Sequence, residues 1–140
     1  ELRACNVEQT KDISDLRNKL NQVLKVSFDF DQTLSEKPMQ DLCLKFMKLG
    51  AEVYVTTSRA LTILDNQKVN HDDLYEVTDR LGIARERIVF TGYEDKYKFL
   101  KDMDLHVDDS YDEIFLINQY PSKCTGFLYE TKFNNGIKEF

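Results

Sequence analysis

The chain alternates five short apolar runs with segments whose apolar residues recur at helical spacing. The runs lie at residues 24–30, 51–57, 87–91, 105–108 and 124–129. In the first run, apolar residues occupy every second position, which is typical of a strand. Strands separated by helices pair in parallel through right-handed crossovers. The pattern therefore predicts an α/β fold, a three-layer sandwich around a doubly wound, mostly parallel five-stranded sheet.

Residues with strong positional preferences mark the ends of the intervening helices. Pro38 and Gly50 bound one predicted helix, and Asn70 and Gly82 bound another. Their apolar faces are predicted to carry Met39, Leu42, Cys43, Phe46 and Leu49 in the first, and Leu74, Val77 and Leu81 in the second.

Two shorter helices are predicted in the second half of the chain. One covers residues 96–103, with Phe99, Leu100 and Met103 facing inward. Ser110 and Glu113 form an S-x-x-E pattern, which predicts a capping box at the start of the other. That helix is expected to continue through Ile117 and to end before Pro121.

A length of 140 residues suits a single domain with one substantial core. We expect the core to span about residues 23–130. Residues 1–22 are predicted to form a helical extension, with a helix over 13–20. Residues 131–140 are predicted to form a tail that contains the turn signal Asn135-Gly136.

The composition excludes several classes of protein. A net charge of -6 argues against strong binding to duplex nucleic acid, which requires a basic face. The longest uncharged stretch, residues 114–122, is too short to cross a bilayer, so we expect no membrane partner. Cys5, Cys43 and Cys124 are widely spaced, which favours buried free thiols over disulfides or zinc. We expect a cytoplasmic protein.

Polar residues end three of the predicted strands at the edge where parallel sheets bind ligands. They are Asp29 and Asp31 at the end of the first strand, Thr57 and Ser58 at the end of the second, and Asp108 and Asp109 at the end of the fourth, with Lys96 opening the preceding helix. Carboxylates so close together require a compensating cation. Oxygen ligands of this kind indicate a hard metal ion, most simply Mg²⁺.

The sequence of residues 26–34, VSFDFDQTL, resembles the first motif (D-x-D-x-T) of haloacid dehalogenase-like (HAD) phosphohydrolases. Residues 53–57 resemble the second motif, Lys96 fits the third, and residues 107–109 fit the acidic fourth. All four occur in order across residues 24–129. The resemblance implies a Rossmann-like HAD core and a Mg²⁺-dependent phosphatase.

The resemblance also implies roles for individual residues. Asp29 would be the nucleophile that forms an aspartyl-phosphate, and Asp31 the general acid and then base, its main-chain carbonyl also reaching the metal. Asp29 and Asp109 would be metal ligands, and Asp108 is the second choice after Asp109 for the ligand from the acidic motif. The phosphoryl group would be bound by Thr57, Ser58 and Lys96.

Too few residues separate the motifs for an inserted cap domain, so we expect an open site. The substrate is then a macromolecule or a small phosphate ester enclosed by a partner subunit. Residues 57–59, Thr-Ser-Arg, are similar to the phosphatase part of polynucleotide kinase-phosphatases and favour a nucleotide or polynucleotide end. The acidic composition argues against a nucleic-acid substrate. One alternative is a catalytically silent HAD-like binding or scaffold protein. A second is a phosphoacceptor signalling domain, although in that class the lysine follows the acids along the chain, whereas here Lys96 precedes Asp108.

Structural interpretations compete for the neighbouring residues. For Thr33 we favour a cap of the turn over a substrate contact, and for His106 a packed histidine over a site residue. Arg59 is equally well explained by an ion pair and by a substrate phosphate. Ordinary helix roles compete with ligand roles for Asp112 and Glu113 (metal binding) and for Tyr93, Tyr97 and Tyr111 (stacking on a base).

Overall fold

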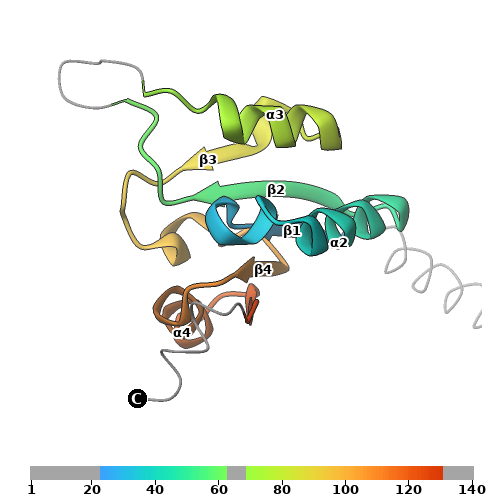
Figure 1. Ribbon diagram of the computed structural model, residues 1–140. Helices are drawn as coiled ribbons and strands as arrows, with labels where there is room; N and C mark the ends of the chain where they lie inside the picture. The colour runs from blue at the N-terminus through green and yellow to red at the C-terminus, as the bar shows by residue number, and fades with distance from the viewer. Residues whose placement is uncertain (1–22, 63–68, 131–140) are drawn as a thin grey trace, which may run out of the picture.

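The computed structural model describes residues 23–62 and 69–130 (Figure 1). The predicted helix over 13–20, the Asn135-Gly136 turn and Cys5 lie outside the described residues. The strands are β1 (Lys25–Phe28), β2 (Glu52–Thr57), β3 (Ile88–Phe90), β4 (Leu105–Asp108) and β5 (Thr125–Leu128). The helices are α2 (Lys37–Lys48), α3 (Asp72–Leu81) and α4 (Tyr111–Gln119). Three short helical turns complete the list: η1 (Phe30–Leu34), η3 (Arg85–Arg87) and η4 (Lys96–Phe99).

The strands form one sheet in the order β3-β2-β1-β4-β5, and every neighbouring pair is parallel. The predicted α/β class and parallel sheet are confirmed. The chain builds outward from β1 to β3 on one side and from β4 to β5 on the other. The boundary between β1 and β4 is therefore the switch point, the place where open parallel sheets bind ligands at the carboxyl ends of their strands.

Two successive residues of β5 show that helices cover both faces of the sheet. Gly126 lies against Ile114 of α4. Phe127, the next residue, lines a groove with Met39 and Phe46 of α2. Successive strand residues point to opposite faces, so α2 and α4 lie on opposite sides. This arrangement is compatible with the three layers of a Rossmann-like fold.

Two buried apolar clusters correspond to these faces. The larger cluster joins α2 and α3 to the sheet and includes Val26, Phe28, Val53, Val55 and Leu74. The smaller cluster, beneath η4 and α4, contains Leu100, Ile114, Ile117 and Cys124. Cys43 and Cys124 are both buried free thiols, as predicted.

Two helix predictions need correction. Leu49 is 83% exposed because α2 ends at Lys48 and Leu49 is the residue after its last turn. Within the segment 96–103 only the 3₁₀ turn η4 forms; Phe99 at its end is 38% exposed, and Leu100, the next residue, is buried as expected. A 3₁₀ turn has three residues per turn, so it places side chains differently from the expected α-helix.

The N-cap position of α3 is His71, one residue after the predicted Asn70, although Asn70 still bonds the start of the helix. Oδ1 of Asn70 accepts a hydrogen bond from the backbone N–H of Asp72 at 2.8 Å, which satisfies one of the first amides of the helix. Gly82 follows the helix at φ +84°, a conformation that favours glycine. Among the described residues, no helix has the length and apolar character needed to cross a membrane.

The close packing of α4 on β5 requires a residue without a side chain at Gly126. A β carbon there would lie 3.0 Å from Cδ1 of Ile114 and 3.4 Å from Cγ2 of Ile117. We expect Gly126→Val to lower the free energy of unfolding by about 1–3 kcal/mol through overpacking, measured by urea denaturation. Thr125→Val, at an exposed position of the same strand, is the matched control and should change stability by less than about 0.5 kcal/mol. Equal effects of the two substitutions would contradict this packing.

Candidate active site

The candidate site lies at the carboxyl ends of β1, β2 and β4, which are neighbours in the sheet (Figure 1). Asp29 directly follows β1, and its backbone N–H donates to the carbonyl of Val107 at 2.9 Å. Asp108 is the last residue of β4, and Thr57 the last of β2. The parallel order of these strands therefore brings together side chains that are far apart in the sequence.

A buried lysine joins the acids of β1 and β4. Nζ of Lys96 lies 2.7 Å from Oδ1 of Asp29 and 2.6 Å from Oδ2 of Asp108. All three residues are almost completely buried. An ammonium in this position is stable only because it is paired with charges of opposite sign. The structure thus unites three of the predicted site residues in one ion-pair network.

Glu113 of α4 positions the backbone of Lys96. Its Oε2 accepts a hydrogen bond from the backbone N–H of Lys96 at 2.9 Å. The predicted capping box is therefore only half formed. Oγ of Ser110 accepts from the N–H of Glu113 at 3.3 Å, but the N–H of Ser110 donates to Oδ1 of Asp108 at 3.0 Å. The carboxylate that would complete the box is used to hold the start of η4.

Asp109 and Thr33 complete the acidic centre. The Thr33 hydroxyl lies 3.3 Å from Oδ2 of Asp29 and 3.3 Å from Oδ1 of Asp109. The prediction that Thr33 caps the turn is wrong, because its hydroxyl faces these two carboxyl groups. Asp29, Asp108 and Asp109 each place one oxygen within 4.8 Å of the others. These three residues could hold a metal ion.

The charges of this centre do not balance. Burial raises the pKa of Asp29 to about 8; Asp108 adds to the shift and Lys96 opposes it. Burial would likewise raise the pKa of Asp108, but the hydrogen bond from His106 and the charge of Lys96 hold it below its usual range. Burial is also the main cause of the raised pKa of Asp109, which shares a hydrogen bond with Asp29. Three carboxyl groups around one ammonium thus retain a proton or accept another cation.

Asp31 lies outside this buried centre. The chain turns sharply at Gln32, where φ is +61°, and the Asp31 side chain is 56% exposed. Its carboxylate is held by Arg59, at 2.7 Å from Nη2 and 3.0 Å from Nε. Arg59 also pairs with Asp73 at 2.8 and 2.9 Å, and this contact lowers the pKa of Asp73 to about 2. Of the two interpretations of Arg59, the structure shows the ion pair.

Thr57 is the last residue of β2, and Ser58 directly follows it. Thr57 is buried, and its Oγ1 accepts a hydrogen bond from the backbone N–H of Arg59 at 3.3 Å. Ser58 is half-buried, and its carbonyl accepts from the N–H of Tyr93 at 2.7 Å. These bonds fix the turn that carries both hydroxyls and Arg59.

The three tyrosines considered as residues that stack on a base differ in their surroundings, and His106 is a separate case. Tyr97 packs on Tyr120 and Tyr111 on Phe115, so helix packing accounts for both. Tyr93 is 81% exposed and has a φ of +69°. His106 is buried and hydrogen-bonded, as favoured, but one of its partners is the site residue Asp108.

Sequence reasoning assigned no role in the site to three polar contacts. His106 lies 2.9 Å from Oδ2 of Asp108, Glu113 holds Lys96, and Arg59 holds Asp31. The alternation of His106 with Asp108 along one strand was a signal for the first contact. No local pattern indicates the other two, because the partners are far apart in the chain.

Searches of protein-family models, of curated proteins and of solved structures find no match to this chain.

The raised pKa of Asp29 has a consequence for stability. Its ordinary value is 3.8, so between about pH 4 and 8 the folded protein keeps a proton that the unfolded chain releases. This contribution to stability is fully present below pH 4 and is lost as the pH rises to about 8. We expect the melting temperature of metal-free protein in EDTA to fall by several degrees between pH 5 and 8 through this group, and Asp29→Asn to flatten that dependence.

The control for this measurement is Asp102→Asn, which removes one exposed acid away from the cluster. It should keep the pH dependence of the wild type. An unchanged slope in Asp29→Asn would show that Asp29 does not hold the proton.

Proposed function

We propose that this protein is a Mg²⁺-dependent phosphatase of the HAD type, which hydrolyses a phosphate monoester through an aspartyl-phosphate intermediate. The observation that carries the proposal is the buried ammonium of Lys96 between Asp29 and Asp108 at the switch point of a parallel sheet. It joins residues of three of the four motifs in one centre. Thr57, from the second motif, ends the neighbouring strand β2.

Asp29 is the nucleophile in the proposed reaction. One of its oxygens bonds to phosphorus while the bond from phosphorus to the leaving oxygen breaks, and Asp31 gives that oxygen a proton. In the second step Asp31 takes a proton from water, the water oxygen bonds to phosphorus, and the bond to Asp29 breaks. Lys96 offsets the charge of the phosphoryl oxygens, and Thr57 and Ser58 donate hydrogen bonds to them.

Arg59 sets the orientation of the general acid in this reaction. The Asp31 side chain is 56% exposed, so a leaving group beside it has access to solvent. Without a partner, a carboxyl group on such a turn would rotate freely. Two hydrogen bonds from one guanidinium fix the plane of the carboxylate, and Asp73 holds the guanidinium from its other side.

The acidic centre fits a hard divalent cation. The oxygens of Asp29, Asp108 and Asp109 are the ligand type that Mg²⁺ prefers, and they are close enough to share one ion. Each of the three carboxyl groups accepts hydrogen bonds from neighbouring groups, so these bonds do not rank them as ligands. We assign Asp29 and Asp109 as the first ligands from the resemblance to the HAD motifs. Bound Mg²⁺ would supply positive charge, which would keep these carboxylates ionised and offset the negative charge of the phosphate.

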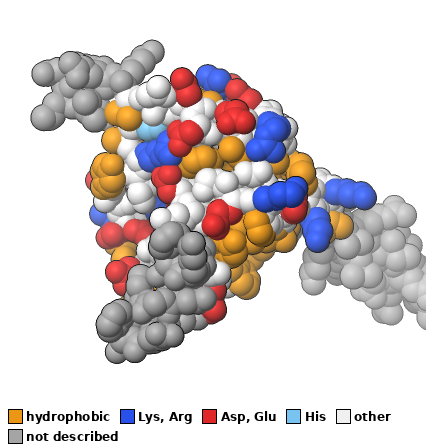
Figure 2. Space-filling model, in the orientation of Figure 1, with side chains coloured by type: hydrophobic (Ala, Val, Ile, Leu, Met, Phe, Trp, Pro, Cys, Tyr) orange, Lys and Arg blue, Asp and Glu red, His pale blue; other side chains and the backbone are white. Residues whose placement is uncertain are grey.

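The proposal includes an open site without a cap domain. Only Ser35 and Glu36 separate η1 from α2. Figure 2 shows basic and acidic side chains interspersed over one face of the molecule, without a continuous basic area. Such a surface does not favour a long polyanion. A nucleotide, the phosphorylated end of a polynucleotide, or another small phosphate ester is the substrate class that we propose.

Mg²⁺ binding is expected to release a proton. Asp29 retains one at pH 7, and a divalent cation competes with it for the same oxygens. Titration calorimetry in two buffers of different ionisation enthalpy should show the release of about one proton per ion bound. Asp109→Asn should weaken binding at least about tenfold, whereas Asp102→Asn should not change it. Binding by Asp109→Asn as tight as that of the wild type would contradict the ligand assignment.

Hydrolysis of an aryl phosphate with Mg²⁺ tests the function directly. The wild type should turn over this substrate, and Asp29→Asn should lose at least about a thousandfold in rate, with Asp102→Asn as the control. A panel of nucleoside monophosphates and 3′-phosphorylated oligonucleotides then identifies the preferred leaving group.

Each alternative function gives a different result. Activity retained in Asp29→Asn would exclude Asp29 as the nucleophile. A stable aspartyl-phosphate formed from acetyl phosphate, without turnover, would indicate a phosphoacceptor domain. Mg²⁺ binding with neither reaction would indicate a binding or scaffold protein.

A further inference from the structure

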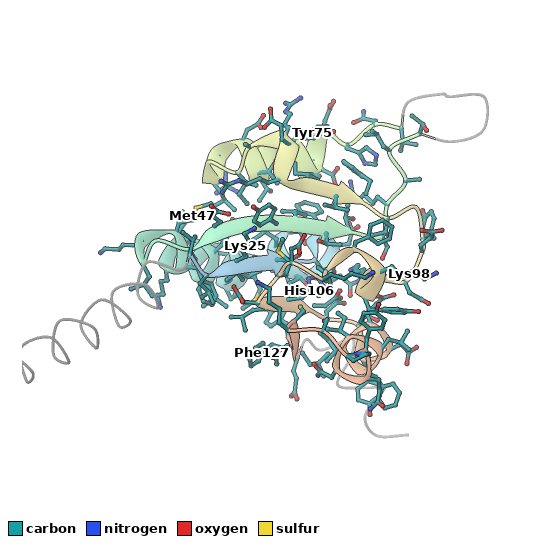
Figure 3. All side chains as sticks on the ribbon, turned by 180° about the vertical axis from the view of Figure 1, so that it is seen from behind. Lys25, Met47, Tyr75, Lys98, His106 and Phe127 are labelled. Carbon is teal, nitrogen blue, oxygen red and sulfur yellow. The ribbon has the colours of Figure 1, made fainter. Side chains whose placement is uncertain are left out.

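His106 is a completely buried polar side chain to which the proposed reaction assigns no role. It lies on β4, on the sheet face opposite α2, because the adjacent Val107 packs in the cluster that includes α2 (Figure 3). Its Nε2 lies 2.9 Å from Oδ2 of Asp108, and its Nδ1 lies 3.0 Å from Oγ of Ser27. Contacts at both nitrogens fix the orientation of the ring.

The partners of the ring decide which nitrogen carries a proton. Oδ2 of Asp108 also accepts from Nζ of Lys96 at 2.6 Å, and Oδ1 accepts from the N–H of Ser110 at 3.0 Å. A carboxylate with these partners is an acceptor, so Nε2 must be the donor. The hydroxyl of Ser27 can donate or accept, so it satisfies Nδ1 in either case. The geometry requires the form of His106 that carries Nε2–H.

The hydrogen bonds continue from His106 across the sheet. The hydroxyls of Ser27 on β1 and Thr56 on β2 lie 2.8 Å apart, and both residues are almost completely buried. The ring of His106 is therefore anchored to β1 and β2. These are the strands that carry Asp29 and Thr57 at their ends. The network ties the orientation of Asp108 to the strands that position the rest of the site.

We propose that His106 is a positioning residue for this site. Its Nε2–H fixes the carboxylate of Asp108, that carboxylate fixes the ammonium of Lys96, and the ammonium lies 2.7 Å from Asp29. Without this donor, the Asp108 carboxylate keeps only the ammonium of Lys96 and the N–H of Ser110 as hydrogen-bond partners. Hydrogen-bond partners behind reactive groups commonly account for a 10- to 100-fold effect on activity. The catalytic consequence depends on the function proposed above, whereas the hydrogen-bond geometry does not.

Two variants of similar size separate positioning from packing. His106→Gln keeps an N–H donor near the position of Nε2, and His106→Leu fills a similar volume without a donor. We expect His106→Leu to lower kcat about 10- to 100-fold with little change in KM, and His106→Gln to recover most of kcat. Thr78→Val removes a buried hydroxyl of α3 and is the control for the loss of a buried polar group. Equal loss of kcat in the Leu and Gln variants would overturn the proposal.

Nuclear magnetic resonance tests the geometry without a substrate. Two-bond ¹H–¹⁵N spectra of the wild type should show a proton on Nε2 of His106, and the Lys96 ammonium signal should be sharp in the wild type and His106→Gln but broadened in His106→Leu. A bare Nε2, or a Lys96 signal unaffected by His106→Leu, would overturn the proposal. If the wild type hydrolyses no phosphate ester, the proposed function fails and these spectra alone decide the positioning role.

Ser27→Ala replaces His106→Leu if that variant does not fold. It removes the partner of Nδ1 and leaves the donor to Asp108 in place. We expect Ser27→Ala to lower kcat by a smaller factor than the one expected for His106→Leu. An unchanged kcat in a folded Ser27→Ala protein would overturn the proposal.

Discussion

The site depends on one buried positive charge, the ammonium of Lys96. Burial of an unpaired ammonium costs several kcal/mol, so the fold must bring acids to it from two strands. The sheet order does this, because Asp29 and Asp108 end neighbouring strands on either side of the switch point. The chain that crosses from β3 back to β4 starts at the same edge of the sheet. Its first turn, η4, therefore carries Lys96 over the ends of β1 and β4.

The two faces of the sheet serve different purposes. On the α2 face, residues such as Val26, Phe28 and Val107 form the larger apolar cluster. On the opposite face, Ser27, Thr56 and His106 are equally buried but polar. These groups satisfy one another through hydrogen bonds, which compensates for the loss of water. A fully satisfied polar network permits fewer alternative packings than an apolar one, and this favours a single geometry at the strand ends.

The sequence predicted the elements well and the contacts between them less well. The strand at residues 105–108 has the predicted bounds, and Asp29, Lys96 and Asp108 meet as expected. Strand periodicity and parallel topology suffice for that result, because they fix which strand ends are neighbours. The roles of Glu113 and Thr33 could not be predicted in this way. Each was expected to cap a local turn, but Glu113 bonds the backbone of Lys96 and Thr33 bonds Asp109 as well as the nearby Asp29. Lys96 and Asp109 are brought near these side chains only by the tertiary structure.

Asp31 does not lie where alternation along the first strand predicts it. The two acids are only two residues apart, and alternation along a strand would put both on one face. The strand ends at Phe28, however, and the turn at Gln32 directs the chain away from the sheet. Asp29 thus remains in the buried centre with Lys96, whereas Asp31 reaches the surface and pairs with Arg59. Two acids only two positions apart thus have entirely different surroundings, one buried beside an ammonium and the other 56% exposed beside a guanidinium.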